Sequence, residues 1–288
     1  PNDQLFSMAE ITAANVGKLR EMTSAGMMDC KKALTEAGGD MDKAVDILRK
    51  SGAASAAKKS LRDAREGLIA QYIAPDGKAG VLVEVNCETD FVARNDTFRA
   101  FSDEIARKVA ANPNVNLDAE REAAVVKIGE NIKIARNARM EVSGHGLIAA
   151  YIHTGAKVGV LVEVGAGKAE TTGKDEFKQL VKDITLQIAA GHPYAVSREQ
   201  VAPEVIAKER EIAAQSDRLK GKPAQAMEKI LAGMLDKFFQ TYCLVDQGFV
   251  KKNSEISVKE HVATVEKLLG DEISVRRFVR FQVGEAAA

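Results

Sequence analysis

Residues 67–85 read GLIAQYIAPDGKAGVLVEV and residues 146–164 read GLIAAYIHTGAKVGVLVEV, and the two stretches align without a gap. At an offset of 79 residues, 13 of the 19 aligned positions are identical. Each stretch holds two apolar runs around a turn, so each predicts two strands joined in a hairpin. A repeat of this kind constrains the architecture before any motif is considered.

The repeat continues beyond the strands into a predicted helix. Apolar positions over 98–111 coincide, at the same offset, with apolar positions over 177–190. Alternating residues also predict strands over 132–142 and 273–283, and positions 273, 275, 279, 281 and 283 are expected to share one face. The fold class is therefore predicted as α+β, with two related core subdomains, each a small antiparallel sheet backed by helices.

Residues 9–50 show three short stretches of helical periodicity. Thr12 and Asp40 are predicted N-caps, Gly38-Gly39 ends the second helix, and Gly52 is expected to end the third. Three helices over about 40 residues make a bundle near the lower size limit for independent stability. Met27 and Met28 lie between the first two helices, where they either fill the core or form an adaptable apolar contact.

Two apolar helical stripes flank the turn Gly221-Lys222-Pro223 and predict an antiparallel helical hairpin. The hairpin either projects as an interaction arm or lies flat on the body, and a strand is expected after it, over 242–250. The predicted domains are a helical domain over 8–52, a linker over 53–66, a first core subdomain over 67–142, a second core subdomain over 143–200 and 241–288, and the inserted hairpin over 201–240. Residues 1–7 are interpreted as a leader or an added remnant.

Composition narrows the function classes. The chain has 41 basic and 41 acidic side chains, so no overall excess of positive charge favours nucleic-acid binding. Three cysteines without CxxC spacing are typical of a reducing cytosol, and four scattered histidines indicate no metal site. No run is apolar enough to predict a membrane span.

The sequence contains no phosphate-binding loop, no GxGxxG after a strand and no GxSxG. Cys87 could be read as a nucleophile with His145 or His153 as its base, but no third group is positioned by the sequence. A lone thiol after a strand is more often a packing residue. We therefore predict that the chain is not an enzyme and has no cofactor or metal of its own.

The two copies differ completely in the segment between the second strand and the helix, at 86–97 and 165–176. The second copy is small and polar there, whereas the first places Asp90 beside Phe91. An aromatic side chain on such a connection predicts a partner that receives it, because rigid aromatics supply much of the binding energy of interfaces. The alternative is that Phe91 packs into its own core.

Two long motifs, TSAGMMDCKKAL at 23–34 and EVNCETDFVA at 84–93, resemble the signatures of the bacterial elongation factor Ts family. The resemblance covers residues 9–284. It implies a guanine-nucleotide exchange factor that binds elongation factor Tu, displaces its Mg²⁺, promotes GDP release and stays bound until GTP binds. It also implies a ubiquitin-associated-like N-terminal domain and an inserted coiled-coil hairpin.

The resemblance assigns roles to particular positions. The segment implied to enter the GTPase and dislodge Mg²⁺ is Thr89, Asp90, Phe91 and Val92. The other implied partner contacts are Met27, Met28, Lys31, Ile128, Gly129 and His153. The implied partner is elongation factor Tu in its GDP-bound and nucleotide-free forms, in the cytoplasm, with a homodimer or a 2:2 complex as further arrangements.

The resemblance implies neither a membrane nor a direct nucleic-acid partner. Some members of the family carry a further C-terminal helical module that packs on the partner. No such module is found before Ala288, and we expect a different affinity for the partner or a different oligomeric arrangement. The alternative function is a ubiquitin-associated-like or RNA-contacting binding module without exchange activity. The balanced charge argues against the RNA-contacting form.

Overall fold

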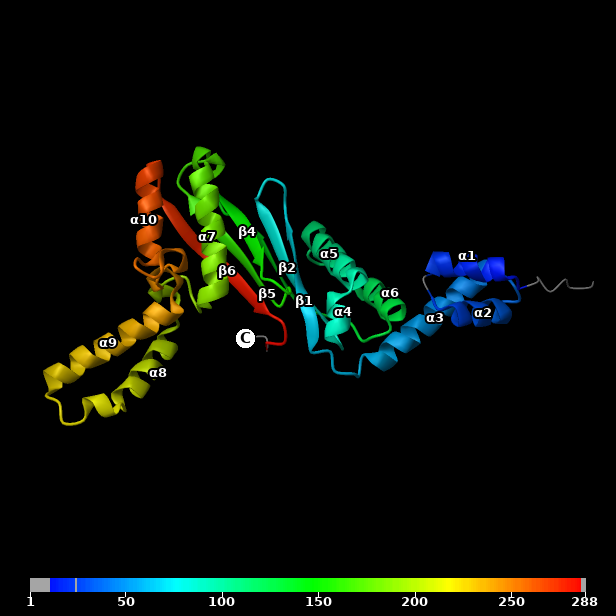
Figure 1. The fold of residues 1–288 in the computed structure, drawn as a ribbon, viewed down its shortest axis with the longest axis horizontal. Helices are drawn as coiled ribbons and strands as arrows, with labels where there is room; N and C mark the ends of the chain where they lie inside the picture. Colours follow the sequence, from blue (N-terminus) through cyan, green and yellow to red (C-terminus); the bar gives the residue numbers. More distant parts are fainter. Residues whose placement is uncertain (1–10, 24, 286–288) are drawn as a thin grey trace, which may run out of the picture.

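The computed structural model describes residues 11–23 and 25–285, so residues 1–7 lie outside it. Two three-stranded antiparallel sheets, ordered β1-β2-β3 and β4-β5-β6, form the centre of an elongated molecule (Figure 1). The strands are β1 (Glu66–Ile73), β2 (Ala79–Cys87), β3 (Lys133–Glu141), β4 (Gly146–Ile152), β5 (Val158–Ala166) and β6 (Ile273–Gln282). The predicted α+β class with small antiparallel sheets is confirmed.

The described residues also form ten α-helices and five short 3₁₀ segments. The helices are α1 (Ala13–Thr23), α2 (Met27–Glu36), α3 (Met41–Lys59), α4 (Asp90–Arg94), α5 (Asp96–Ala111), α6 (Asp118–Ile128), α7 (Asp175–Gly191), α8 (Pro203–Ala214), α9 (Ala224–Tyr242) and α10 (Val258–Leu269). The 3₁₀ segments are η1 (Glu170–Gly173), η2 (Arg198–Gln200), η3 (Asp217–Leu219), η4 (Leu244–Asp246) and η5 (Val250–Lys252).

The sequence repeat corresponds to a repeat in structure. The first hairpin pairs Leu68 with Val85, and the second pairs their equivalents, Leu147 with Val164. Helix α5 covers one face of the first sheet and α7 covers the corresponding face of the second (Figure 1). Phe98 of α5 and Phe177 of α7 are fully buried at equivalent positions, each in the core of its own unit.

The other faces of the two sheets pack against each other through a third apolar cluster. Its buried members come from all six strands: Ile69, Leu82, Met140, Ile148, Leu161 and Phe281. Gly80 and Gly159 occupy equivalent positions where the sheets approach closely. A Cβ atom at Gly159 would lie 2.4 Å from Ile69, and one at Gly80 would lie 2.7 Å from Ile148, so only glycine allows this approach.

The two units hold each other in a nearly two-fold symmetric way. The turn of each hairpin accepts a backbone hydrogen bond from the first strand of the other hairpin: Ile148 N to Gly77 O at 2.8 Å, and Ile69 N to Ala156 O at 2.7 Å. The lysine of each turn donates to the other unit in the same way: Lys78 Nζ to Gly146 O at 2.8 Å, and Lys157 Nζ to Gly67 O at 3.0 Å. The cores of the two units therefore form one packed body.

The predicted alternation of the last strand is wrong in one respect. A β-bulge between Arg277 and Val275 places Arg276 opposite no partner, and the apolar face changes there. Ile273 and Val275 pack into the α7-side core, whereas Val279, Phe281 and Val283 pack between the sheets. One extra residue in a strand reverses the facing of all that follow.

The prediction that Gly52 ends the third helix is also wrong, because α3 continues to Lys59. The residues after Gly52 are rich in alanine, serine and lysine, and the alanines and lysines favour helix. Gly52 faces Val126 of α6, and Ala56 is buried in the core of the first unit. The helix-favouring composition and these contacts together stabilise α3 beyond Gly52, into the predicted linker.

Helices α8 and α9 pack against each other and extend away from the second sheet (Figure 1), so the alternative in which the hairpin lies flat on the body is wrong. No residue of α9 is buried. The strand expected over 242–250 is not formed. The chain there makes η4, the start of η5 and two isolated bridges, Ala195 to Cys243 and Gly248 to Ser257. Tyr242 still belongs to α9, and the N–H groups of Leu244 and Val245 donate to Ala195 O and Val196 O instead of to a neighbouring strand of the sheet.

Candidate functional site: a short helix with an exposed aromatic

The segment that differs between the repeats contains the short helix α4 in the first copy. Thr89 is its N-cap, and its side-chain oxygen accepts a hydrogen bond from Val92 N at 3.3 Å. Asn95 ends α4 and caps α5 by accepting from Thr97 N at 2.8 Å. The Thr89 side chain at the start of α4 and the Asn95 N–H, which donates to Val92 O at its end, explain why five residues form a helical turn between two larger elements.

Phe91 is 82% exposed, although the next two residues of α4, Val92 and Ala93, face the protein. Ala93 is buried in the core of the first unit, and Val92 packs against that core. The alternative in which Phe91 folds into its own core is therefore wrong. Asp90 is paired with Arg94 at 2.9 Å in a largely exposed ion pair, which contributes little to stability in water.

The N-terminus of α4 is fixed by a carboxylate that is distant in sequence. Glu130 Oε2 accepts hydrogen bonds from Glu88 N at 2.9 Å and from Thr89 N at 3.0 Å. Glu130 Oε1 accepts from the Thr89 hydroxyl at 2.6 Å. Sequence reasoning missed Glu130, and the signal that could have pointed to it is an acid directly after the Gly129 helix stop.

Ile128 and Gly129 lie directly before Glu130. Gly129 ends α6 with φ at +89°, a left-handed conformation that favours glycine. Its carbonyl accepts a hydrogen bond from Lys59 Nζ, at the end of α3, at 2.8 Å. Ile128 packs partly against the core of the first unit. The structure thus brings two of the implied contact residues next to the segment that carries Phe91.

Met27 and Met28 open helix α2 and are 49% and 64% exposed. Lys31, one turn further along the helix, is exposed as well. The alternative in which the methionine pair fills the bundle core is wrong, because that core is made by other residues: Val16, Leu19, Cys30, Ala33, Leu34 and Ala44. In Figure 1, α2 lies well away from α4, so these residues form a second, separate surface.

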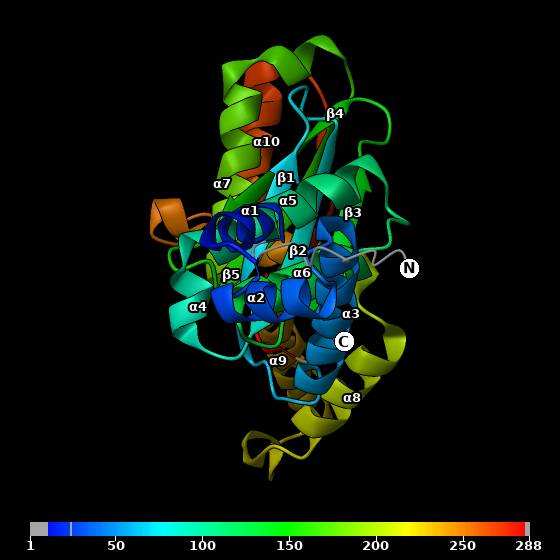
Figure 2. The ribbon, with the colours of Figure 1, turned by 90° about the vertical axis from the view of Figure 1, so that its right-hand side faces the viewer.

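His153 follows β4 in the second unit. Its ring Nδ1 lies 3.0 Å from the Tyr151 hydroxyl. Together with Arg99 and Asp103 of α5, it lines one surface pocket at the boundary between the two units. His153 therefore lies beside α5, the helix that follows α4. Figure 2 shows α4 at the margin of the molecule.

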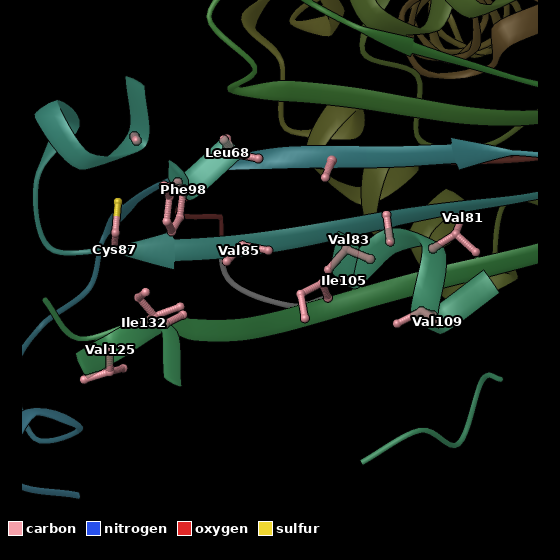
Figure 3. Close-up of a cluster of buried hydrophobic side chains, with 14 of the residues drawn as sticks. Leu68, Val81, Val83, Val85, Cys87, Phe98, Ile105, Val109, Val125 and Ile132 are labelled. Carbon is pink, nitrogen blue, oxygen red and sulfur yellow. The ribbon is translucent and has the colours of Figure 1, made fainter. Parts of the chain in front are cut away.

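Cys87 ends β2 beneath α4 and is fully buried (Figure 3). Its thiol donates to Thr89 O at 3.2 Å. Burial, reinforced by the nearby Glu130 carboxylate, raises the pKa of the Cys87 thiol to about 12. A thiol that stays protonated at neutral pH is a poor nucleophile, which argues against the reading of Cys87 as a catalytic residue.

We expect the native protein to protect Cys87 from thiol reagents. In a variant with Cys30→Ala and Cys243→Ala, Cys87 is the single thiol, and a disulfide reagent at pH 8 measures its reaction rate. Because only the thiolate reacts, raising the pKa from 9.0 to about 12 slows the reaction roughly a thousandfold relative to the protein unfolded in urea. Equal rates in the native and unfolded protein would show that Cys87 is accessible and ionised.

Over residues 11–23 and 25–285, no group of three or more histidine, cysteine, aspartate or glutamate side chains is arranged to hold a metal ion. Within the same ranges, no helix is both long and apolar enough to cross a membrane.

Known proteins similar to this chain agree with one another. The family model described as Elongation factor TS matches residues 88–285. Proteins named Elongation factor Ts are 44% identical in Nitratidesulfovibrio vulgaris (strain DP4), over 96% of this chain and 97% of the relative, and 46% identical in Symbiobacterium thermophilum, over 96% and 93%. The protein of that name from Nostoc sp. is 41% identical over 96% and 94%. This chain belongs to the elongation factor Ts family.

Proposed function

We propose that this protein is the guanine-nucleotide exchange factor of elongation factor Tu. The observation that carries the proposal is Phe91, an aromatic side chain that is 82% exposed on a short helix capped and hydrogen-bonded at its N-terminus. A rigid aromatic side chain that its own core does not bury can supply much of the binding energy of an interface at low entropy cost. Membership in the elongation factor Ts family identifies the partner as the GTPase of translation elongation.

The proposed mechanism is thermodynamic linkage. The protein binds the nucleotide-free form of elongation factor Tu more tightly than the GDP-bound form, so it must weaken GDP binding by the same factor. Phe91 inserts between two helices of the GTPase, and the segment from Thr89 to Val92 displaces the Mg²⁺ that holds the phosphates. GTP later releases the protein by the same reciprocity.

The exchange reaction needs no catalytic residue, cofactor or metal from this chain. The separate surface of Met27, Met28 and Lys31 supplies a second contact with the GTPase. Flexible methionines suit such a surface, because they adapt to the partner at low energetic cost. Ile128, Gly129 and His153 extend the contact around α4 across the first and second units.

Each domain of the chain has its own part in the proposed function. The bundle over 8–52 is a ubiquitin-associated-like domain, and the segment over 53–66 joins it to the core. The core subdomains over 67–142 and over 143–200 with 241–288 present the α4 segment, and residues 201–240 form a coiled-coil hairpin. The protein acts in the cytoplasm without direct contact with nucleic acid or membrane, as a homodimer or in a 2:2 complex with elongation factor Tu.

The proposal is tested by mixing the protein with elongation factor Tu loaded with fluorescent GDP and Mg²⁺, in excess unlabelled GDP. Stopped-flow fluorescence should show GDP release that accelerates with protein concentration and reaches a plateau. Elongation factor Tu alone gives the baseline rate. A release rate that stays at this baseline at saturating protein concentration would overturn the proposed function.

A further inference from the structure

The two repeats share a structural device that the sequence alignment of their hairpins does not cover. In each unit, a helix ends at a left-handed glycine that is followed at once by an acid. Gly129 and Glu130 follow α6, and Gly270, with φ at +60°, and Asp271 follow α10. The third strand of the sheet comes next in both units, as β3 or β6.

Both acids hold the connection after the second strand of their own sheet. Asp271 Oδ2 accepts from Lys168 N at 3.0 Å and from the Thr171 hydroxyl at 2.6 Å. Glu130 accepts from two backbone N–H groups and from the Thr89 hydroxyl, as described above. We call each arrangement an acid clamp; its two forms are Glu130 with Glu88 and Thr89, and Asp271 with Lys168 and Thr171.

The two acid clamps hold different surfaces. The Asp271 clamp fixes η1, where Thr171 is buried, and no large apolar side chain over 165–176 is exposed. The Glu130 clamp fixes the start of α4, where Phe91 is exposed. The clamp itself is therefore scaffold, and the first copy uses it beneath an exposed aromatic side chain.

The Glu130 clamp is also linked to the segment that leaves the N-terminal bundle. Asn131 N donates to Glu88 Oε1 at 2.6 Å, and Asn131 Nδ2 donates to Arg62 O at 2.7 Å. Lys59 Nζ binds the carbonyl of Gly129. Because Glu130 lies between these bonds, its carboxylate has little freedom to move away from α4.

We propose that Glu130 is a positioning residue for Phe91, an inference that rests on the proposed exchange function. A helix of five residues is not stable in isolation. The Thr89 side chain satisfies only one of the free N–H groups at the start of α4, that of Val92. The carboxylate satisfies two further N–H groups and orients the Thr89 hydroxyl, so α4 presents Phe91 in one preformed orientation. Preorganisation of this kind removes the entropy cost that a mobile aromatic would incur on binding.

Substitution distinguishes positioning from general stabilisation. Glu130→Ala removes all three acceptors, whereas Glu130→Gln retains the geometry: its carbonyl oxygen accepts both backbone N–H groups, and its amide donates to the Thr89 oxygen. Asp271→Ala removes the equivalent clamp from the second unit, whose connection over 165–176 carries no aromatic side chain. If Glu130 acts only through stability, the two alanine variants should behave alike.

The experiment measures fluorescent GDP release from elongation factor Tu against protein concentration. We expect Glu130→Ala to lower the plateau rate about tenfold, because charge-assisted hydrogen bonds to α4 are lost. The half-saturating concentration should change by less than about threefold, because the other contacts remain. Glu130→Gln should restore the plateau to within about threefold of wild type, and Asp271→Ala should leave it unchanged.

Hydrogen exchange of the free protein, followed by mass spectrometry, gives a second readout that needs no partner. Amides over 88–94 should lose protection in Glu130→Ala and regain it in Glu130→Gln. A wild-type plateau for Glu130→Ala, or equal slowing by Asp271→Ala, would overturn the positioning role. A wild-type protein that fails to accelerate GDP release would instead overturn the proposed function, while the exchange data would still decide whether Glu130 holds α4.

Discussion

Replacing Phe91 with alanine should slow GDP release from elongation factor Tu more than any other single substitution in this chain. Truncation of an aromatic residue at the centre of an interface costs about 2–4 kcal/mol of binding. Under the proposed linkage, the loss falls on the nucleotide-free complex and converts to a factor of roughly 30 to 1,000. The plateau rate in stopped-flow fluorescence should drop accordingly.

The substitution should leave the fold intact, which makes the kinetic result interpretable. Phe91 is 82% exposed and is absent from the apolar clusters of the protein. Exposed positions of this kind usually change stability by about 0.5 kcal/mol or less. Circular dichroism and the thermal midpoint should therefore match those of the wild-type protein.

Leu268→Ala provides the matched control. Leu268 on α10 is another large apolar side chain that is mostly exposed, but it lies outside every contact implied by the family resemblance. Its removal should change neither the plateau rate nor the half-saturating concentration. If elongation factor Tu releases GDP at the wild-type rate with the Phe91→Ala variant, Phe91 does not drive exchange by inserting into the GTPase, whatever the affinity of the complex.

The repeat made the architecture predictable from sequence. An offset of 79 residues relates Leu68 to Leu147 and Phe98 to Phe177, and equivalent residues occupy equivalent places in the two units. Equivalent positions in the two copies have similar packing environments. Residues that are identical in both copies therefore reflect the requirements of the shared fold. The same comparison isolated Phe91, because scaffold requirements do not explain a residue present in only one copy.

Features that depend on contacts between distant segments were not predictable. Glu130 lies about forty residues beyond Thr89, and only the folded chain shows that its carboxylate meets the start of α4. The bulge at Arg276 likewise depends on pairing with β5 and not on any local preference. Local propensity cannot report such tertiary effects.

Glu163→Ala should destabilise the core more than substitution of any exposed charge. Glu163 is buried in β5, and its carboxylate accepts from Ser143 N at 2.8 Å, from Arg276 at 2.9 Å and from Arg277 at 2.7 Å. Its equivalent, Glu84, accepts from Arg136 at 2.7 Å and from Gly284 N at 3.0 Å. Each glutamate thus binds the third strand of its own sheet. It also binds a residue that follows the third strand of the other sheet: Ser143 after β3, or Gly284 after β6.

Removal of one partner from such a buried ion pair typically costs about 3–5 kcal/mol, because the remaining charges stay desolvated without compensation. Asp217→Ala is the control, since its pair with Lys220 is largely exposed and should contribute about 0–1 kcal/mol. Native-state hydrogen exchange of β2 and β5 amides in increasing urea measures the stability of the two-sheet body separately from α1–α3 and α8–α9. Equal exchange in the two variants would contradict the structural role of Glu163.

The same carboxylate predicts a pH dependence with a definite sign. Burial opposes ionisation of Glu163, but hydrogen bonds from Ser143 N, Arg276 and Arg277 outweigh it and lower its pKa below the ordinary value of 4.5. A group with a lowered pKa in the folded state adds stability above its unfolded pKa, and this stability is lost as the pH falls through the folded value.

The stability difference between wild type and Glu163→Ala should therefore be constant from pH 7 down to about 5. It should shrink below pH 4.5, because protonation removes from the wild type the charge that the variant already lacks. A difference that grew on acidification would mean that burial dominates and that Glu163 is held as a neutral acid.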